Sequence, residues 1–199
     1  MEFKPGNNSS KLTTYNEQLL EAEEVQQIFC NEFLHDIGSF YIVEPDGTYR
    51  DDEKFSYGTA VFKMKQIEES YHKGLTILVK NLENWNEKIQ RRCKELGEST
   101  NVHMYLSPGG GSGFDWHNDD RDVYVHMQMG QKHFEVKEPD GKISSYDLTE
   151  KSCLYMPYAI LHRASAGNAP SVHLSFGVWP KGMTVQKQYQ GIDFPIKLL

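Results

Sequence analysis

The segment SPGGGSGFDWHNDDRDVYVHMQMGQKHFEV, residues 107–136, joins a glycine-rich run to an acidic stretch and then to a strand-like segment. It allows three interpretations: a phosphate-binding glycine loop, an acidic surface turn, or half of a metal site. The phosphate interpretation fails because Gly113 is followed by Phe114 rather than by Lys and Ser or Thr. No helix follows whose N-terminus would hold a phosphate. Four aspartates nearby would also repel an anion: Asp115, Asp119, Asp120 and Asp122.

His117 and Asp119 are the residues of this segment that favour a metal site. On an extended chain, residues two apart point to the same side, so these two side chains supply two ligands to one ion. Such a spacing often arises by chance, and a hydrogen-bonded pair in a loop remains the alternative. His162, in CLYMPYAILHRASAG, follows another strand-like run and is a candidate third ligand. Two histidines and one carboxylate are typical of non-haem Fe(II) oxygenases.

Composition limits the class of protein. The chain has 199 residues, a formal net charge of −7 and no basic stripe, which argues against nucleic acid as a partner. Three cysteines without a CxxC pair argue against a disulfide framework and against a thiolate zinc site, and favour the cytoplasm. The sequence contains no apolar run long enough to predict a membrane span. We expect a flexible leader over residues 1–14 and a single catalytic domain over residues 15–199.

Helical patterns occupy the first half of the chain and strand patterns the second. Apolar residues from Leu19 to Phe33 recur at helical spacing, with Gly38 as a possible helix end, and residues 39–49 predict a strand and a turn. A clearer helix is predicted over residues 82–96, ending at Gly97. From residue 102 onward, short runs rich in β-branched and aromatic residues predict a sandwich or barrel. The fold class expected is α+β with a mainly β core.

Three blocks carry a resemblance to a known family: residues 105–136, YMPYAILHRA (155–164) and SVHLSFGV (171–178). Together they resemble JmjC-type Fe(II)/2-oxoglutarate oxygenases, in the ribosomal-oxygenase-like branch of the cupin superfamily. The resemblance covers residues 75–180 approximately. It implies a double-stranded β-helix of the jelly-roll type, with the N-terminal helices packed outside.

The resemblance also implies a set of functional residues. His117, Asp119 and His162 would bind Fe(II), and 2-oxoglutarate would be the co-substrate. In this family a basic residue 15 positions after the first ligand histidine pairs with the distal carboxylate of 2-oxoglutarate, and here that residue is Lys132. A buried dicarboxylate needs such a cation. Further candidates for binding the co-substrate are Tyr105, Ser107 and His173.

The implied activity is hydroxylation of an amino-acid side chain in a protein or peptide, with molecular oxygen as the oxidant. Phe114 and Trp116 are candidates for shaping the substrate entrance. Tyr124, His126 and Gln128 share one strand face whose direction the sequence leaves open. Two alternatives come from other classes: a metal-dependent cupin enzyme that does not use 2-oxoglutarate, and a non-catalytic JmjC-like binding module.

Overall fold

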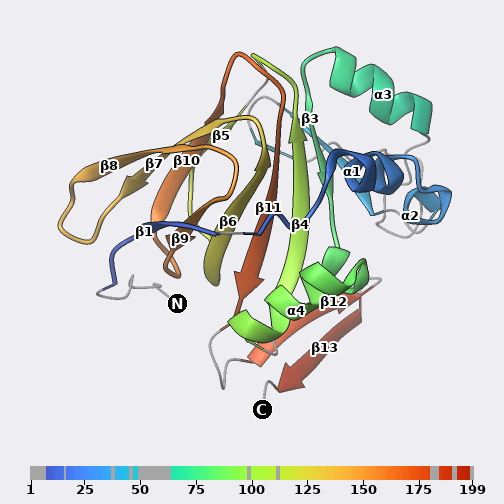
Figure 1. Ribbon diagram of the computed structural model, residues 1–199. Coiled ribbons are helices and arrows are strands. Elements are labelled where there is room, and N and C mark those ends of the chain that lie inside the picture. The colour runs from blue at the N-terminus through green and yellow to red at the C-terminus, as the bar shows by residue number, and fades with distance from the viewer. Residues whose placement is uncertain are drawn as a thin grey trace.

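Two antiparallel β-sheets that face each other form the centre of the computed structural model (Figure 1). The structure describes residues 8–15, 17–36, 39–44, 47–48, 64–97, 100–110, 113–179, 184–189 and 192–197.

The larger sheet has seven strands and the smaller has four. In spatial order, the larger sheet contains β1 (Lys11–Thr14), β9 (Ser152–Met156), β6 (Asp122–Met129), β11 (Ser171–Val178), β4 (Thr100–Ser107), β3 (Thr76–Val79) and β2 (Phe40–Val43). The smaller sheet contains β5 (Phe114–His117), β10 (Leu161–Ala166), β7 (Lys132–Lys137) and β8 (Ile143–Leu148). A separate hairpin pairs β12 (Thr184–Tyr189) with β13 (Ile192–Lys197).

Strand alternation gives the larger sheet two different faces. On β4, Val102, Met104 and Leu106 point into an apolar core outside the two-sheet barrel, whereas the residues between them face the smaller sheet. The same alternation on β11 places Leu174 and Phe176 in the outer core. Burying side chains of this size contributes about 1.5–3 kcal/mol each. Because the apolar side chains of these strands are buried on the outer face, the residues that point toward the smaller sheet can be polar.

Helices cover the outer face of the larger sheet, on the right and below in Figure 1. They are α1 (Ala22–Phe29), α2 (Glu32–Asp36), α3 (Met64–His72), the 3₁₀ helix η1 (Leu82–Asn84) and α4 (Glu87–Leu96). Ile28, Ile67 and Ile89 reach from these helices into the outer core, together with Leu20 just before α1. None of the described helices is long and apolar enough to cross a membrane.

Two short helices replace the single one predicted between Leu19 and Phe33. α1 ends at Phe29 and α2 begins at Glu32, because the side chain of Asn31 accepts a hydrogen bond from the backbone N–H of Leu34 at 3.1 Å. An asparagine in this position caps a new helix rather than continuing the old one. Gly38, the predicted helix end, lies outside the described residues, as do Pro45 and Asp46 of the predicted turn.

The predicted second helix is confirmed as α4, although its first turn is separate. Leu82 belongs to η1, and Asn86 then caps α4 by accepting a hydrogen bond from the Ile89 N–H at 2.8 Å. The helix ends at Gly97, whose φ of +148° lies in the region that favours glycine. Sequence reasoning did not predict α3, β5, β8, β10 or the β12–β13 hairpin.

Residues 11–14 differ from the flexible leader expected over residues 1–14. They form β1, an edge strand whose residues pair with 152–155 of β9. The edge of β9 would otherwise expose a row of unpaired backbone groups, so a short polar strand can add there without an apolar face of its own. Residues 1–7 lie outside the described part of the chain.

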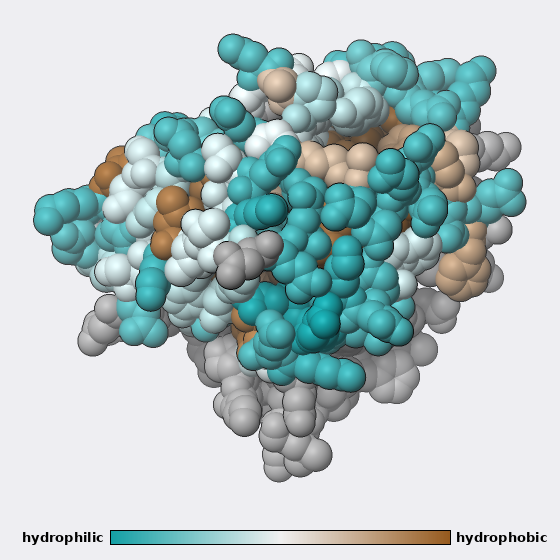
Figure 2. All heavy atoms as spheres, viewed as in Figure 1, coloured by the Kyte–Doolittle hydropathy of each residue, from teal (hydrophilic) through white to brown (hydrophobic). Residues whose placement is uncertain are grey.

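A second apolar core lies between the sheets and is smaller than the outer one. Val125 and Met127 of β6 meet Phe134 and Val136 of β7 within it. The face of the molecule seen in Figure 2 is mostly hydrophilic, with hydrophobic residues showing in scattered spots. The predicted α+β class with a mainly β core is thus confirmed, with its N-terminal helices outside.

Candidate metal centre and its cavity

Pairing of β5 with β10 brings His117 next to His162. The two residues are opposite partners in the antiparallel register, and their ring centroids lie 4.3 Å apart. β5 approaches β10 this closely because Gly113 has no side chain. A Cβ at Gly113 would lie 1.8 Å from the backbone oxygen of Ala164. The glycine run therefore serves the backbone approach to this site.

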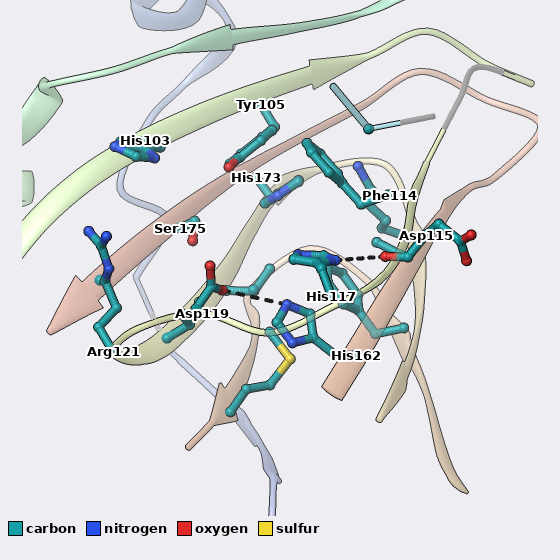
Figure 3. Close-up of a pocket in the computed structure, with 18 of the residues that line it drawn as sticks. His103, Tyr105, Phe114, Asp115, His117, Asp119, Arg121, His162, His173 and Ser175 are labelled. Carbon is teal, nitrogen blue, oxygen red and sulfur yellow. Dashed lines mark hydrogen bonds and ion pairs between the residues drawn. The ribbon is translucent and has the colours of Figure 1, made fainter. Parts of the chain in front are cut away.

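Asp119 completes a three-residue cluster with His117 and His162 (Figure 3). One ligand atom from each residue lies within 4.8 Å of the other two. Asp119 Oδ2 lies 3.6 Å from His162 Nε2. Asp119 is fixed by its own backbone, whose oxygen accepts a hydrogen bond from the N–H of Ala159 at 3.0 Å. The structure thus brings together the three residues predicted as metal ligands.

Backbone carbonyls orient both imidazoles. His117 Nδ1 lies 2.7 Å from the oxygen of Asp115, and His162 Nδ1 lies 3.0 Å from the oxygen of Ile160. A carbonyl only accepts, so Nδ1 carries the proton in each ring and Nε2 keeps a free lone pair. Such hydrogen bonds are the usual way in which proteins fix a histidine for metal binding.

The environment also favours the neutral form of His162. Burial lowers the pKa of this imidazole, and the neighbouring His117 lowers it further, while Asp119 acts in the opposite direction. Metal binding requires deprotonated ligands, so a neutral imidazole at physiological pH suits that role. The nearby Asp122 is not one of the proposed ligands, because its Oδ1 accepts a hydrogen bond from the backbone N–H of Tyr158 at 2.8 Å.

Lys132 is a buried cation at the start of β7. Its side chain is among the largest fully buried ones, at 2% exposure, and burial lowers the pKa of its ammonium group to about 8. Its Nζ donates a hydrogen bond to Ser107 Oγ at 2.9 Å, and Thr76 Oγ1 lies 3.1 Å from the same hydroxyl. Among the described residues no carboxylate forms an ion pair with Lys132. The site thus holds a positive charge whose counter-ion the described chain does not supply.

His173 and Tyr105 stand next to Lys132 on the cavity wall. Their rings stack with centroids 4.7 Å apart and planes 5° apart. Burial, and then the charge of Lys132, lower the pKa of His173 well below its ordinary value. Within the described residues its buried Nδ1 has no hydrogen-bond partner. Burying a polar atom without a hydrogen-bond partner costs free energy, which indicates that a bound ligand supplies the missing partner.

The cluster and the lysine face one cavity of about 430 Å³ between the two sheets. Tyr105, Lys132 and His173, predicted as co-substrate residues, line it, as do Phe114 and Trp116. Ser107 differs, because it is fully buried behind Lys132 and reaches the cavity only through the hydrogen bond to that ammonium group.

Tyr124, His126 and Gln128 point away from this cavity. The Gln128 carboxamide oxygen accepts the backbone N–H groups of Leu19 and Leu20 at 3.1 and 2.8 Å. Gln128 therefore fastens the N-terminal segment to the outer face of β6, and the His126 ring lies 4.9 Å from the Tyr15 ring of the same segment, centroid to centroid.

Lys80, Asn101, Arg121 and Met156 are among the cavity-wall residues that sequence reasoning missed. A usable signal existed for Asn101, which continues the polar alternation of His103 and Tyr105 along β4. Arg121 lies in a loop, and only the folded chain shows where its side chain points.

Comparison with known proteins gives one family model, described as the JmjC domain, which matches residues 78–153. The bifunctional lysine-specific demethylase and histidyl-hydroxylase NO66 of Dictyostelium discoideum is 24% identical over 134 residues, covering 55% of this chain and 26% of that protein. NO66 of Branchiostoma floridae is 29% identical over 107 residues, covering 52% of this chain and 17% of that protein. The chain thus spans only a small part of these relatives. The predicted resemblance to JmjC-type proteins is confirmed.

Solved structures of the Escherichia coli ribosomal oxygenase YcfD share the fold. One matches with a TM-score of 0.57 and 16% identity, covering 86% of this chain and 48% of YcfD. Another, of YcfD in complex with cobalt and 2-oxoglutarate, matches with a TM-score of 0.56 at the same identity and the same coverage. At such identity the similarity establishes the fold alone, and the predicted cupin-like, JmjC-like jelly roll is confirmed.

Proposed function

We propose that this protein is an Fe(II)- and 2-oxoglutarate-dependent oxygenase that hydroxylates an amino-acid side chain of a protein or peptide. One observation carries the proposal: His117, Asp119 and His162 converge on a cavity that also contains the buried, uncompensated cation Lys132. A set of three metal ligands alone would fit many cupin enzymes. The additional lysine selects a co-substrate with a carboxylate at the far end from the metal.

The donor set fits iron. Two neutral imidazoles and one carboxylate on one side of an ion leave the remaining positions open, as in non-haem Fe(II) oxygenases. The described residues place no cysteine in the cavity wall, in contrast to structural zinc sites with thiolate ligands. When bound, iron and 2-oxoglutarate supply the oxidising power that inserts one oxygen atom from O₂ into a substrate C–H bond.

The chain's own residues bind, orient and exclude water. Lys132 holds the distal carboxylate of the co-substrate by a charge-assisted hydrogen bond, and Ser107 keeps the ammonium group in place. His173 offers its free Nδ1 to the same ligand. Phe114 packs edge-on against Tyr105, with ring centroids 5.7 Å apart, and so limits water access beside the cluster.

The substrate class is inferred from the relatives. NO66 is named as a histidyl-hydroxylase and YcfD as a ribosomal oxygenase, so a protein or peptide is the substrate we propose. All three cysteines are free, which supports the proposed cytoplasmic location. Neither the net charge of −7 nor the cavity favours a nucleic acid.

The test separates metal binding from co-substrate turnover. Purified protein would be loaded anaerobically with Fe(II), titrated with 2-oxoglutarate, and then exposed to oxygen while succinate is measured. We expect His117→Ala, Asp119→Ala and His162→Ala to lose metal binding. The matched control His133→Ala changes an exposed histidine that pairs with Asp147 outside the cavity, and should behave as wild type.

The outcome also distinguishes the alternatives. Tight metal binding without any response to 2-oxoglutarate would favour a cupin enzyme of another chemistry. Binding of metal and 2-oxoglutarate without succinate release, even with candidate peptides, would favour a non-catalytic module. Normal turnover in Asp119→Ala would refute the proposed metal site.

A further inference from the structure

The cavity has a second polar end, far from Lys132. Its floor is the inward face of the paired strands β4 and β11, where opposite residues follow in the order Ser107–Ser171, Tyr105–His173, His103–Ser175 and Asn101–Gly177. Ser107 and Asn101 are six positions apart, which corresponds to about 20 Å along an extended strand. The three proposed metal ligands therefore face a polar floor, and Lys132, the proposed co-substrate residue, lies at one end of it. At the other end, Arg121, His103 and Ser175 lie on the Asp119 side of the cluster (Figure 3).

Arg121 is held in a defined position at this second end. Its guanidinium lies over the Trp179 ring, 3.9 Å from the centroid, and its Nη1 donates to Asn101 Oδ1 at 3.2 Å. Gly177 provides the room, since a Cβ there would lie 2.4 Å from Arg121 Cδ and 2.5 Å from Asn101 Oδ1. The Arg121 side chain is 23% exposed, and its Nε pairs with the more exposed Asp120. Among the described residues, Nη2 of Arg121 has no hydrogen-bond partner.

Hydrogen bonding makes His103 a donor as well. Because Asn101 Oδ1 accepts from Arg121, its Nδ2 is the atom that faces His103 Nε2, at 2.9 Å. Nδ2 can only donate, so Nε2 is the acceptor and the proton of His103 is on Nδ1. Burial, followed by the charges of Lys80 and Arg121, lowers the pKa of His103 to about 3. The ring is therefore neutral and keeps one N–H for a ligand.

This end of the cavity thus combines two cations with a neutral donor. Lys80, Asn101, His103 and Arg121 all line the cavity, and we call them the Arg121 subsite. Asp120, next to Arg121 in the chain, is 59% exposed and pairs with the Nε edge of the guanidinium. In a chain with a net charge of −7, this concentration of donors and positive charge selects an anionic acceptor.

We propose that the Arg121 subsite binds a carboxylate of the substrate, so that the residue entering the cavity is an aspartate, a glutamate or a C-terminal residue. This inference rests on the proposed function and specifies the substrate of the same site. A carboxylate held by Arg121 places the neighbouring carbon atoms between the subsite and the metal cluster. Arg121 is then a specificity-determining residue, separate from the metal ligands and from Lys132.

The experiment measures peptide binding without requiring turnover. The probes are blocked pentapeptides of alanine whose central residue is Asp, Glu, Asn, Gln, Lys or Arg, together with an alanine peptide that has a free C-terminal carboxylate. Dissociation constants would be measured by ligand-observed NMR, on metal-free protein and on protein loaded with Zn(II) and 2-oxoglutarate. We expect the carboxylate probes to bind about tenfold more tightly than the amide and basic probes.

Variants assign the preference to Arg121. We expect Arg121→Gln to weaken carboxylate binding about tenfold, and Arg121→Lys to retain part of it. The control Arg91→Gln removes an arginine of α4 that is 60% exposed and paired with Glu17, and should keep the full preference. Equal melting temperatures of the variants would show that the changes act on the site and not on folding.

Each result has a defined meaning. Preference for the Asp or Glu probes identifies a side-chain carboxylate, and preference for the free acid alone identifies a chain terminus; both support the proposal. Equal or better binding of the amide or basic probes, or an unchanged preference in Arg121→Gln, overturns it. Failure of the proposed function would look different, because 2-oxoglutarate turnover would be absent while carboxylate binding to metal-free protein persisted.

Discussion

Replacing Lys132 by methionine is predicted to stabilise the ligand-free protein while removing co-substrate binding. The ammonium group is 2% exposed, and burial lowers its pKa from the ordinary 10.5 to about 8. Each pKa unit corresponds to about 1.4 kcal/mol, so keeping this charge inside costs on the order of 3 kcal/mol at neutral pH. Methionine fills a similar space without a charge.

The pH dependence of stability gives an independent check with a defined sign. Below about pH 8 the lysine is protonated in both the folded and the unfolded states, so its full cost is present. Between about 8 and 10.5 the unfolded chain binds more protons than the folded one, and stability should therefore rise with pH through this range. The Lys132→Met variant should lack that rise.

Thermal denaturation without metal or co-substrate measures the stability change. For a chain of this size, 3 kcal/mol corresponds to an increase of roughly 6–12 °C in Tm. Lys137→Met, on the exposed end of the same strand, is the matched control and should change Tm little. Binding of 2-oxoglutarate should weaken by about 2–5 kcal/mol in Lys132→Met, a factor of roughly 30 to 4000. A less stable Lys132→Met protein, or one with unchanged 2-oxoglutarate affinity, would refute the assigned role.

Two further predictions concern the scaffold. Gly113→Ala should lower metal affinity about tenfold or more by pushing β5 away from β10, whereas Gly167→Ala, whose Cβ would have an ordinary 3.5 Å contact, should not; titration with Co(II) followed by absorption spectroscopy compares them. Phe176→Ala should lower the free energy of unfolding by about 3–5 kcal/mol in urea denaturation, because this side chain is fully buried in the outer core. Phe33→Ala, at a position that is 67% exposed, should leave unfolding nearly unchanged.

The sequence predicted those parts of the site that depend on local spacing. His117 and Asp119 are two residues apart, so short-range geometry is sufficient for them. Lys132 was predicted only from the spacing within the JmjC-type family pattern. The β core was predictable for a similar reason, since alternation along β4, β6 and β11 reflects burial of one face. The break between α1 and α2 was not, because a capping asparagine competes locally with an apolar stripe that continues past it.

The remaining features depend on strand pairing, which a single sequence does not show. Ser107 lies behind Lys132 because β4 and β7 belong to different sheets that face each other. Arg121 has no motif of its own and becomes part of the cavity only where Gly177 of β11 leaves space beside Asn101 of β4. In both cases the decisive information is which strand lies opposite which.

The different burial of Lys132 and Arg121 indicates that the two cations bind different ligands. Lys132 is fully buried and bears the desolvation cost described above, which suits a small co-substrate that is bound in every catalytic cycle. Arg121 remains partly exposed and shares its charge with Asp120, which suits a larger substrate that must enter and leave. Ser107 and Asn101, which hydrogen-bond to Lys132 and Arg121 respectively, lie about 20 Å apart along β4, on the strand face that lines the cavity. This arrangement keeps two carboxylates from competing for one cation and allows each to be tested by its own substitution.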